Sequence, residues 1–249
     1  MTSPWIINYQ ANPQAFLRIF CFPYAGTGAS IFRTWSTYLP PNIEVFGVQL
    51  PGRENRYKEP KFTNIVPLIP TLTSALLPYL NQPFVFFGHS VGALLSFEVA
   101  RQLRRRQYPT PLHLFISSHR APQLPNLDLP ISQLSDVDLL EELRHYNGTP
   151  SSILQNAEFI NFYLPICRAD LAVKESYVYL REPPLNCQIS VFGGINDRKI
   201  SQDSLASWRE QTCTKFNLQM FPGDHFYLKS QQESLLKVIA LDLINTTVE

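Results

Sequence analysis

A pentapeptide of the form Gly-X-Ser-X-Gly constrains this chain more than any other stretch, because it joins an apolar run to a helical pattern. The run at residues 84–87 predicts a buried strand, and the residues after Ser90 predict a helix. Gly88 and Gly92 fit a sharp turn whose strained backbone leaves no room for a Cβ atom. Ser90 is therefore expected to stand exposed above a sheet. A serine in an ordinary strand-to-helix connection is the alternative.

Short apolar runs that are rich in strand-forming residues alternate with helical patterns along the chain. Strands are expected at residues 17–22, 43–50, 84–87, 112–117, 188–192 and 217–221. Helices are expected at residues 31–38, 71–80, 91–106, 205–210 and 234–244. Since the strands are apolar throughout and helices lie between them, the sequence predicts an α/β fold with a mostly parallel central sheet flanked by helices.

This alternation stops between about residues 120 and 180, where no strand is expected. Ser135 is placed to cap the first of several helices in this part. The helices are expected at residues 135–148, 153–163 and 166–179, separated by Pro150 and Pro165. Their aromatic and aliphatic residues supply more apolar surface than a solvated connection needs. The expectation is a single domain over residues 1–249 with a helical lid insertion at about 120–180.

Charge and cysteine usage narrow the class of protein. The formal net charge is +1, and no basic stripe interleaved with aromatic residues is present, which argues against a nucleic-acid partner. The first residues lack the pattern of a signal peptide, and no apolar run could span a bilayer, so a cytoplasmic protein without membrane contact is expected. The four cysteines lie far apart without a Cys-X-X-Cys pair, so free thiols and no metal site are expected.

A serine hydroxyl is a poor nucleophile, so Ser90 needs a neighbouring base and an acid that orients the base. His225 is the best candidate for the base, because it follows a predicted strand and precedes the last helix. The other histidines, at positions 89, 113, 119 and 145, are expected to have structural or surface roles.

Asp197 is the best candidate for the acid, because it follows a strand that runs into a glycine turn. Asp203 is expected to cap a helix, and Asp224 is too close to His225 in the sequence to orient its ring. A merely structural turn aspartate remains the alternative for Asp197. The order Ser, Asp, His is the order found in α/β-hydrolases.

An oxyanion hole usually combines the N–H group after the nucleophile with one from a loop after an early strand. Val91 would supply the first N–H group, and the loop at residues 22–28 would supply the second, with Ala25 as the best donor. A phosphate-binding loop is the alternative, but no Gly-Lys-Ser/Thr or dinucleotide pattern is completed there.

Several segments together resemble the type II thioesterases associated with nonribosomal peptide and polyketide synthases. They are Phe-Pro-Tyr-Ala-Gly at 22–26, Gln-Leu-Pro-Gly-Arg-Glu at 49–54, Gly-His-Ser-Val-Gly-Ala at 88–93, Gly-Thr-Pro at 148–150, Arg-Ala-Asp at 168–170 and Gly-Asp-His-Phe at 223–226. The resemblance extends over nearly the whole chain. Val91, Arg198 and Thr27 depart from the family's usual residues, and none of the three removes a catalytic group.

This resemblance implies an α/β-hydrolase fold and a standalone editing enzyme that needs no cofactor and no metal. Such an enzyme hydrolyses aberrant or stalled acyl groups from the phosphopantetheine arm of acyl or peptidyl carrier proteins, which would be its partners. A monomer is expected. His225 would deprotonate Ser90, Asp197 would stabilise the imidazolium, and water would hydrolyse the acyl-enzyme.

Other functions stay open at this point. The same triad could serve a hydrolase of small oxoesters or lipids, or an acyltransferase, and the same fold could serve as a non-catalytic binding module. The lid could be mobile or a fixed cap. The basic helix end is expected to be solvated, and docking of an acidic carrier protein by Arg101 and residues 104–106 is the alternative.

Overall fold

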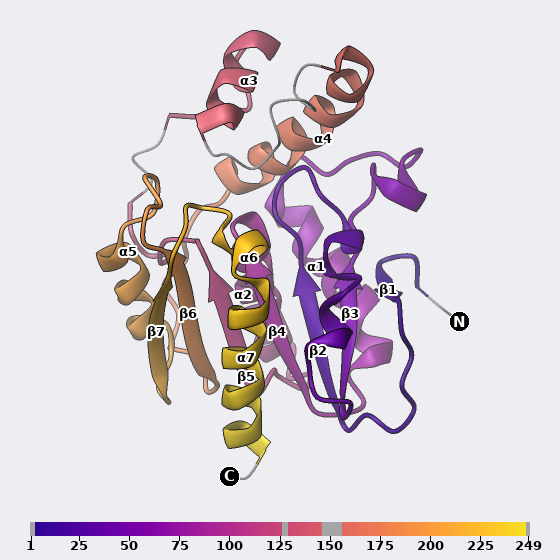
Figure 1. The fold of residues 1–249 in the computed structure, drawn as a ribbon, viewed down its shortest axis with the longest axis vertical. Coiled ribbons are helices and arrows are strands. Elements are labelled where there is room, and N and C mark those ends of the chain that lie inside the picture. Colours follow the sequence, from indigo (N-terminus) through magenta and orange to yellow (C-terminus); the bar gives the residue numbers. More distant parts are fainter. Residues whose placement is uncertain (1–2, 126–128, 146–155, 248–249) are drawn as a thin grey trace.

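The computed structural model describes residues 3–125, 129–145 and 156–247. A seven-stranded sheet lies at its centre, in the order β1-β3-β2-β4-β5-β6-β7 (Figure 1). The strands are β1 (Ile6–Asn8), β2 (Leu17–Phe22), β3 (Ile43–Val48), β4 (Phe84–His89), β5 (His113–Ser117), β6 (Gln188–Gly194) and β7 (Phe216–Phe221). All neighbouring pairs are parallel except β1 with β3. The mostly parallel sheet is confirmed, and β1 is a strand that the sequence pattern did not predict.

Helices cover both faces of the sheet. They are α1 (Ile65–Leu76), α2 (Val91–Arg105), α3 (Asp136–His145), α4 (Ala157–Glu175), α5 (Gln202–Ala206), α6 (Tyr227–Ser230) and α7 (Gln232–Thr247), with 3-10 helices η1 (Ala29–Phe32), η2 (Trp35–Thr37), η3 (Glu54–Arg56), η4 (Leu77–Tyr79) and η5 (Ser207–Gln211). Apolar side chains of α1, α2, α5 and η5 form the core on one face. Those of η1, η2 and α7 form the core on the other.

Strand β4 shows why the strands are apolar throughout. Successive side chains of a strand point to opposite faces of the sheet. Phe86 enters the core beneath α1 and α2, whereas Val85 and Phe87 enter the core beneath α7. Both faces of β4 are therefore buried, and its carboxyl end delivers the following residue, Ser90, to the edge of the sheet where the lid helices lie (Figure 1).

The helix expected at residues 31–38 is not one continuous helix, because the structure has the two 3-10 helices η1 and η2 there. Phe32 and Trp35 are three residues apart, and side chains at this spacing lie above one another in a 3-10 geometry. Both rings are buried, with centroids 4.9 Å apart. The Thr37 hydroxyl donates to the Thr34 carbonyl over 2.7 Å, so a local side-chain bond competes with a regular helix here.

Two boundaries also differ from those expected. Helix α1 begins at Ile65, before residue 71, because the Asn64 side chain accepts the Val66 N–H at 2.8 Å and caps the helix. Pro70 lies inside this helix. The helix expected around residues 205–210 is α5 followed by η5.

The described part of the insertion contains α3 and α4, which lie above the carboxyl ends of the strands (Figure 1). The Ser135 hydroxyl accepts the Asp138 N–H at 3.2 Å, so the predicted cap of the first helix is confirmed. The two helices expected around Pro165 are wrong, because α4 continues from Ala157 to Glu175 with this proline inside it. Leu164 and Leu171 pack against Leu139 of α3, and this tertiary packing outweighs the lost backbone bond. Gly148 and Pro150 lie outside the described residues.

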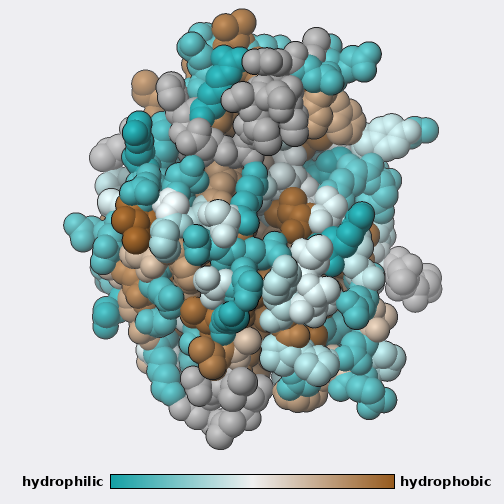
Figure 2. Space-filling model, in the orientation of Figure 1, coloured by the Kyte–Doolittle hydropathy of each residue, from teal (hydrophilic) through white to brown (hydrophobic). Residues whose placement is uncertain are grey.

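Arg104 and Arg105 at the end of α2 form ion pairs with an acidic residue of the same chain. Both guanidinium groups lie within 2.7 Å of Glu182, which follows the lid. Arg104 is half-buried, whereas Arg105 and Arg106 are exposed, so the solvated helix end agrees with the structure, and the carboxylate partner weakens the docking alternative. On the molecular face in Figure 2, hydrophilic and hydrophobic side chains are interspersed.

All four cysteines are free thiols, as predicted. In the part of the chain that the structure describes, no helix is long and apolar enough to cross a bilayer.

Candidate active site

Ser90 occupies a strained turn between β4 and α2. Its φ of 54° and ψ of −119° lie outside the regions that ordinary residues adopt. A Cβ atom on Gly92 would come within 2.1 Å of the Phe22 carbonyl oxygen, and one on Gly88 within 2.3 Å of the Gly92 oxygen. The Ser90 N–H donates to the Ser117 carbonyl over 2.8 Å, which ties the turn to the end of β5. The two glycines thus permit the close contacts that hold this turn.

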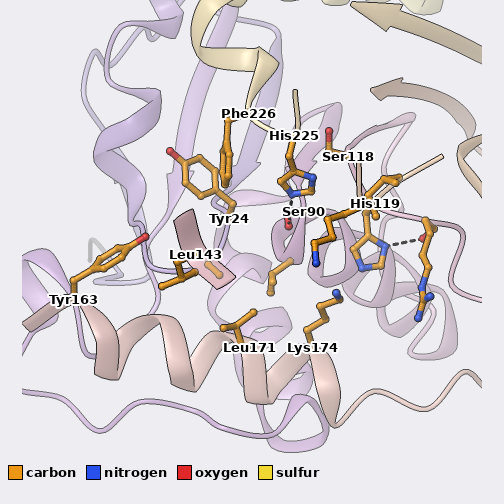
Figure 3. A pocket seen from close by; sticks show the side chains of 15 residues that line it. Tyr24, Ser90, Ser118, His119, Leu143, Tyr163, Leu171, Lys174, His225 and Phe226 are labelled. Atoms are coloured by element: carbon orange, nitrogen blue, oxygen red, sulfur yellow. Dashed lines mark hydrogen bonds between the residues drawn. The ribbon is translucent and has the colours of Figure 1, made fainter. Parts of the chain in front are cut away.

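The structure brings the three predicted triad residues together. His225 Nε2 lies 3.2 Å from Ser90 Oγ (Figure 3), and His225 Nδ1 lies 2.7 Å from Asp197 Oδ2. Asp197 can only accept a hydrogen bond when ionised, so Nδ1 carries the proton and Nε2 can accept the Ser90 hydroxyl proton. This arrangement gives a hydroxyl, a base and an orienting carboxylate in the geometry that nucleophilic catalysis requires.

The loops after β6 and β7 position the acid and the base. Asp197 Oδ1 accepts the backbone N–H groups of Lys199 at 2.9 Å and Ile200 at 3.1 Å, so the carboxylate is fixed from both sides. Gly194 lies between this loop and the next, where a Cβ atom would meet the Asp224 carbonyl oxygen at 2.1 Å. The Asp224 carboxylate accepts the Phe226 N–H at 2.9 Å, whereas Asp197 Oδ2 lies 2.7 Å from His225 Nδ1. The preference for Asp197 over Asp224 therefore agrees with the geometry.

His89 lies directly behind the site. Its Nδ1 is 2.8 Å from the Ser117 hydroxyl, which is 2.7 Å from the Tyr227 hydroxyl. The His89 and His225 rings have centroids 5.3 Å apart. Burial, reinforced by the nearby His225, lowers the pKa of His89 well below its usual range, so this ring is neutral. His89 therefore supports the site as a neutral, structural group.

The predicted oxyanion donors lie at the same cavity as the nucleophile. Ala25 and Val91 both line the cavity that Ser90 and His225 line. The neighbouring amides are already bound within the protein, since Gly26 N–H donates to Asp170 Oδ2 at 2.8 Å and Thr27 N–H to the Tyr24 carbonyl at 3.2 Å. These bonds favour Ala25 as the donor from this loop.

A buried ion pair supports the oxyanion loop, and sequence reasoning had given it no role. Arg53 Nη1 and Nη2 lie 2.6 and 2.7 Å from the two carboxylate oxygens of Asp170, and both side chains are 4% exposed. Arg53 Nη1 also donates to the Thr27 carbonyl at 3.0 Å. Asp170 belongs to α4, so one pair binds the lid helix, the loop after β3 and the backbone at Gly26. Arg53 and Asp170 both lie in segments that resemble the family, and this resemblance was the sequence signal that could have indicated their role.

The cavity beside Ser90 is mainly apolar on the lid side and polar near β5. Its apolar lining includes Tyr24, Leu143, Tyr163, Leu171, Ile200 and Phe226 (Figure 3). Its polar lining includes Ser118, His119, Arg120, Lys174 and Lys199. An apolar lid above a nucleophile suits an acyl chain. The expectation that His119 has only a structural or surface role overlooked its place in this lining.

Of the remaining histidines, His113 lies within the sheet, with Nε2 3.0 Å from the Ser190 hydroxyl. Burial lowers the pKa of His113 to about 3, so it is neutral and structural, as predicted. The His145 side chain lies outside the described residues.

Comparison with known proteins agrees with this geometry. The family model described as "Thioesterase domain" matches residues 17–242. The gramicidin S biosynthesis protein GrsT of Aneurinibacillus migulanus is 44% identical over 239 residues, which cover 96% of this chain and 93% of GrsT. The structure of RedJ, a thioesterase of the prodiginine pathway in Streptomyces coelicolor, is 36% identical with a TM-score of 0.87, covering 93% of this chain and 95% of RedJ. That of BorB, the type II thioesterase of the borrelidin biosynthetic cluster, is 33% identical with a TM-score of 0.87, covering 95% and 96%.

Proposed function

Since the chain belongs to the thioesterase family, we propose that it hydrolyses acyl thioesters on the phosphopantetheine arm of acyl or peptidyl carrier proteins. The observation that carries this proposal is the hydrogen-bonded series Ser90, His225 and Asp197 beside an apolar cavity. The acyl groups would be aberrant or stalled ones, so the enzyme would return blocked carriers to use. GrsT and BorB support this assignment, because their names place them in gramicidin S and borrelidin biosynthesis.

In the first half of the reaction, His225 Nε2 takes the Ser90 proton as Oγ attacks the thioester carbonyl. The Asp197 carboxylate, whose Oδ2 lies 2.7 Å from His225 Nδ1, stabilises the imidazolium that forms. The N–H groups of Ala25 and Val91 hold the oxyanion, and loss of one such donor costs about 2.7–4 kcal/mol of transition-state stabilisation. The C–S bond then breaks, and His225 gives its proton to the departing phosphopantetheine thiol.

In the second half, water replaces the thiol. His225 takes a proton from this water, the resulting hydroxide attacks the Ser90 ester, and the acid leaves while the proton returns to Ser90. The apolar residues of α3 and α4 would shelter the acyl chain during both steps. The chain would act as one domain, with the insertion at about residues 120–180 forming this cover.

Three substrates with one acyl group test the proposal: the acyl carrier protein, a thioester of a small thiol and the matched oxoester. We expect kcat/KM to be highest for the carrier-bound thioester and free acid to be the product. Ser90→Ala should lower kcat roughly 10⁶-fold, the loss found when a serine protease loses its nucleophile.

Each alternative predicts a different outcome of the same experiment. Faster oxoester turnover would favour a hydrolase of small esters or lipids. Acyl transfer to an added thiol or alcohol, with little free acid, would favour an acyltransferase. Equal activity of the Ser90→Ala variant would exclude Ser90 as the nucleophile, and no turnover of any substrate would favour a binding module.

A further inference from the structure

Two buried polar side chains line the active-site cavity and have no part in the mechanism above. Ser118 is 1% exposed and His119 is 6% exposed, and both line the cavity beside Ser90. Ser118 Oγ and His119 Nε2 have no hydrogen-bond partner among the described residues. A buried polar atom without a partner is costly, so atoms of this kind commonly await a ligand or an ordered water molecule.

The hydrogen-bonding capacity of His119 is fixed by its neighbour. His119 Nδ1 lies 2.7 Å from the Arg120 carbonyl oxygen. A carbonyl oxygen only accepts, so Nδ1 carries the ring proton and Nε2 presents a lone pair to the cavity. Burial lowers the pKa of His119 to about 3, and the Lys174 ammonium adds to this, so the ring stays neutral near pH 7. His119 is thus an acceptor, and the Ser118 hydroxyl can also accept.

Both side chains are held close to the reacting atoms. The Ser117 carbonyl accepts the Ser90 N–H at 2.8 Å, and Ser118 and His119 are the next two residues of the chain. Ser118 has a φ of 46°, a conformation that side-chain-bearing residues rarely adopt. The Trp208 indole donates to the His119 carbonyl over 2.7 Å and fixes the loop. Figure 3 shows Ser118 beside His225 and the His119 ring directed towards Lys174 of α4.

The charges around the cavity limit which donor fits there. Arg120, Lys174 and Lys199 line it, and no carboxylate does so among the described lining residues, although Lys199 is paired with Glu142 over 3.4 Å. An ammonium group on the acyl chain would meet like charges, which disfavour it. A purely apolar acyl chain would leave Ser118 Oγ and His119 Nε2 unpaired. A neutral hydroxyl or amide N–H group avoids both costs.

We propose that Ser118 and His119 form a specificity site for acyl groups that carry a neutral hydrogen-bond donor close to the thioester carbonyl. The donor would be a hydroxyl group, as in a hydroxyacyl chain, or an amide N–H group, as in a peptidyl chain. This proposal rests on the proposed thioesterase function and narrows its substrate class.

Two isosteric pairs of thioesters of the same small thiol test the site. The first pair is 3-hydroxybutanoyl and 3-methylbutanoyl, in which a methyl group replaces the hydroxyl group. The second is N-acetylglycyl and 4-oxopentanoyl, in which a methylene group replaces the amide N–H. A glycyl thioester adds the ammonium case. The quantity measured is the ratio of kcat/KM within each pair, which does not depend on the fraction of folded enzyme.

The variants separate the two side chains and the backbone strain. His119→Phe removes the acceptor, and His119→Gln restores one through its amide oxygen. Ser118→Ala and Ser118→Gly both remove the hydroxyl group, but only Gly relaxes the positive φ. A shared effect of the two Ser118 variants therefore belongs to the hydroxyl group.

We expect wild-type enzyme to favour the donor-bearing member of at least one pair by about tenfold, in line with one buried hydrogen bond. His119→Phe should reduce that ratio towards one, and His119→Gln should restore part of it. Glycyl thioester should be a poorer substrate than N-acetylglycyl thioester. Which pair shows the preference distinguishes hydroxyacyl from peptidyl substrates.

A ratio of kcat/KM near one within both pairs for the wild-type enzyme would overturn the proposal, as would a preference that survives in His119→Phe and in both Ser118 variants. In those cases thioesters are still hydrolysed and the proposed function stands. If none of the thioesters is hydrolysed, on the small thiol or on a carrier, the proposed function itself fails.

Discussion

Asp197 is fixed more firmly than the orientation of one imidazole ring requires. One carboxylate oxygen faces His225 Nδ1 at 2.7 Å, and the other accepts two backbone N–H groups of its own loop. Arg198 lies within this Asp197 loop, between the carboxylate and the two N–H groups that it accepts. The carboxylate therefore has a single orientation available, in which its charge lies behind the imidazole.

Asp197→Asn tests that charge at the scale of one residue. The asparagine keeps the shape of the side chain, but its amide group favours the wrong tautomer of His225 and cannot stabilise the imidazolium. We expect kcat to fall roughly 10⁴-fold, as when the triad aspartate of a serine protease is replaced. Thioester hydrolysis at saturating substrate measures this. Unchanged kcat would show that another acid orients His225.

The residues of the proposed triad could be predicted from the sequence, whereas the contacts that support them could not. Ser90, Asp197 and His225 each follow a recognisable strand, so local pattern and chain order identify them. The Arg53–Asp170 pair joins residues 117 positions apart, and nothing local signals such a contact. The place of His119 in the cavity depends on how the loop after β5 turns, and the positive φ at Ser118 is invisible in the sequence.

At the scale of elements, β4, α2 and the loop after β2 meet at Gly92. A Cβ atom there would lie 2.1 Å from the Phe22 carbonyl oxygen and 2.6 Å from that of Pro23. Both are backbone atoms, so neither can move without shifting the loop that contains Ala25. The position of the nucleophile helix and that of the oxyanion loop are therefore set by the same contact.

Gly92→Ala should separate α2 from this loop. We expect kcat to fall at least about 100-fold, the usual consequence of a displacement near 1 Å at a reacting centre. The melting temperature should also fall. Gln102→Ala on the same helix is the matched control and should retain activity. Wild-type kcat in Gly92→Ala would contradict the contact.

The Arg53–Asp170 pair offers a second test between elements. Asp170→Asn leaves the Arg53 charge buried without its counter-charge. Such a change typically lowers the free energy of unfolding by about 3–5 kcal/mol. The Gly26 N–H group also loses a charged acceptor, so kcat should fall in addition to the stability of the fold. Urea unfolding and thioester kinetics measure the two effects.

Lys237→Ala is the control for that variant. It breaks the Glu233–Lys237 ion pair on α7, whose side chains are 64% and 69% exposed. Exposed pairs contribute little to stability, so neither the unfolding midpoint nor kcat should change measurably. An Asp170→Asn protein that behaves like this control would mean that the buried pair is unimportant.

The order of the elements could be predicted, but their exact form depends on packing. Alternating apolar runs predicted six strands at or near their observed positions. Pro165 suggested a helix boundary. Helix α4 nevertheless continues through Pro165, because its residues on both sides of the proline pack against α3. The segment at residues 31–38 forms 3-10 helices because Phe32 and Trp35 fill the same core. Strand β1 has only three residues, too few for a pattern.

At the scale of the whole molecule, neutral buried histidines make the fold sensitive to acid. Burial lowers the pKa of His113 and of His119 to about 3 from 6.5. Between these values the unfolded chain binds protons that the folded chain does not, so the free energy of unfolding falls as the pH falls. The stability that these rings contribute is fully present above pH 6.5 and is lost towards pH 3.

We expect a loss on the order of 3 kcal/mol per histidine between about pH 6.5 and pH 4. His113→Gln removes one titrating group while keeping a donor for the Ser190 hydroxyl. Urea unfolding across this range should therefore show a shallower pH dependence for the variant, even if it is less stable at pH 7. Parallel curves would show that His113 does not carry this dependence.

The Arg53–Asp170 pair also bears on how such enzymes can diversify. Helix α4 carries residues that line the cavity beside Ser90, and it also carries the carboxylate that pairs with Arg53 in the loop after β3. A chimera that takes its lid from a relative therefore needs one of two things. Either the relative's counterpart of residues 51–54 is transferred with the lid, or the transferred lid keeps an aspartate at the position of Asp170. The cover and the loop after β3 form one exchangeable module, and recombination that cuts between them breaks it.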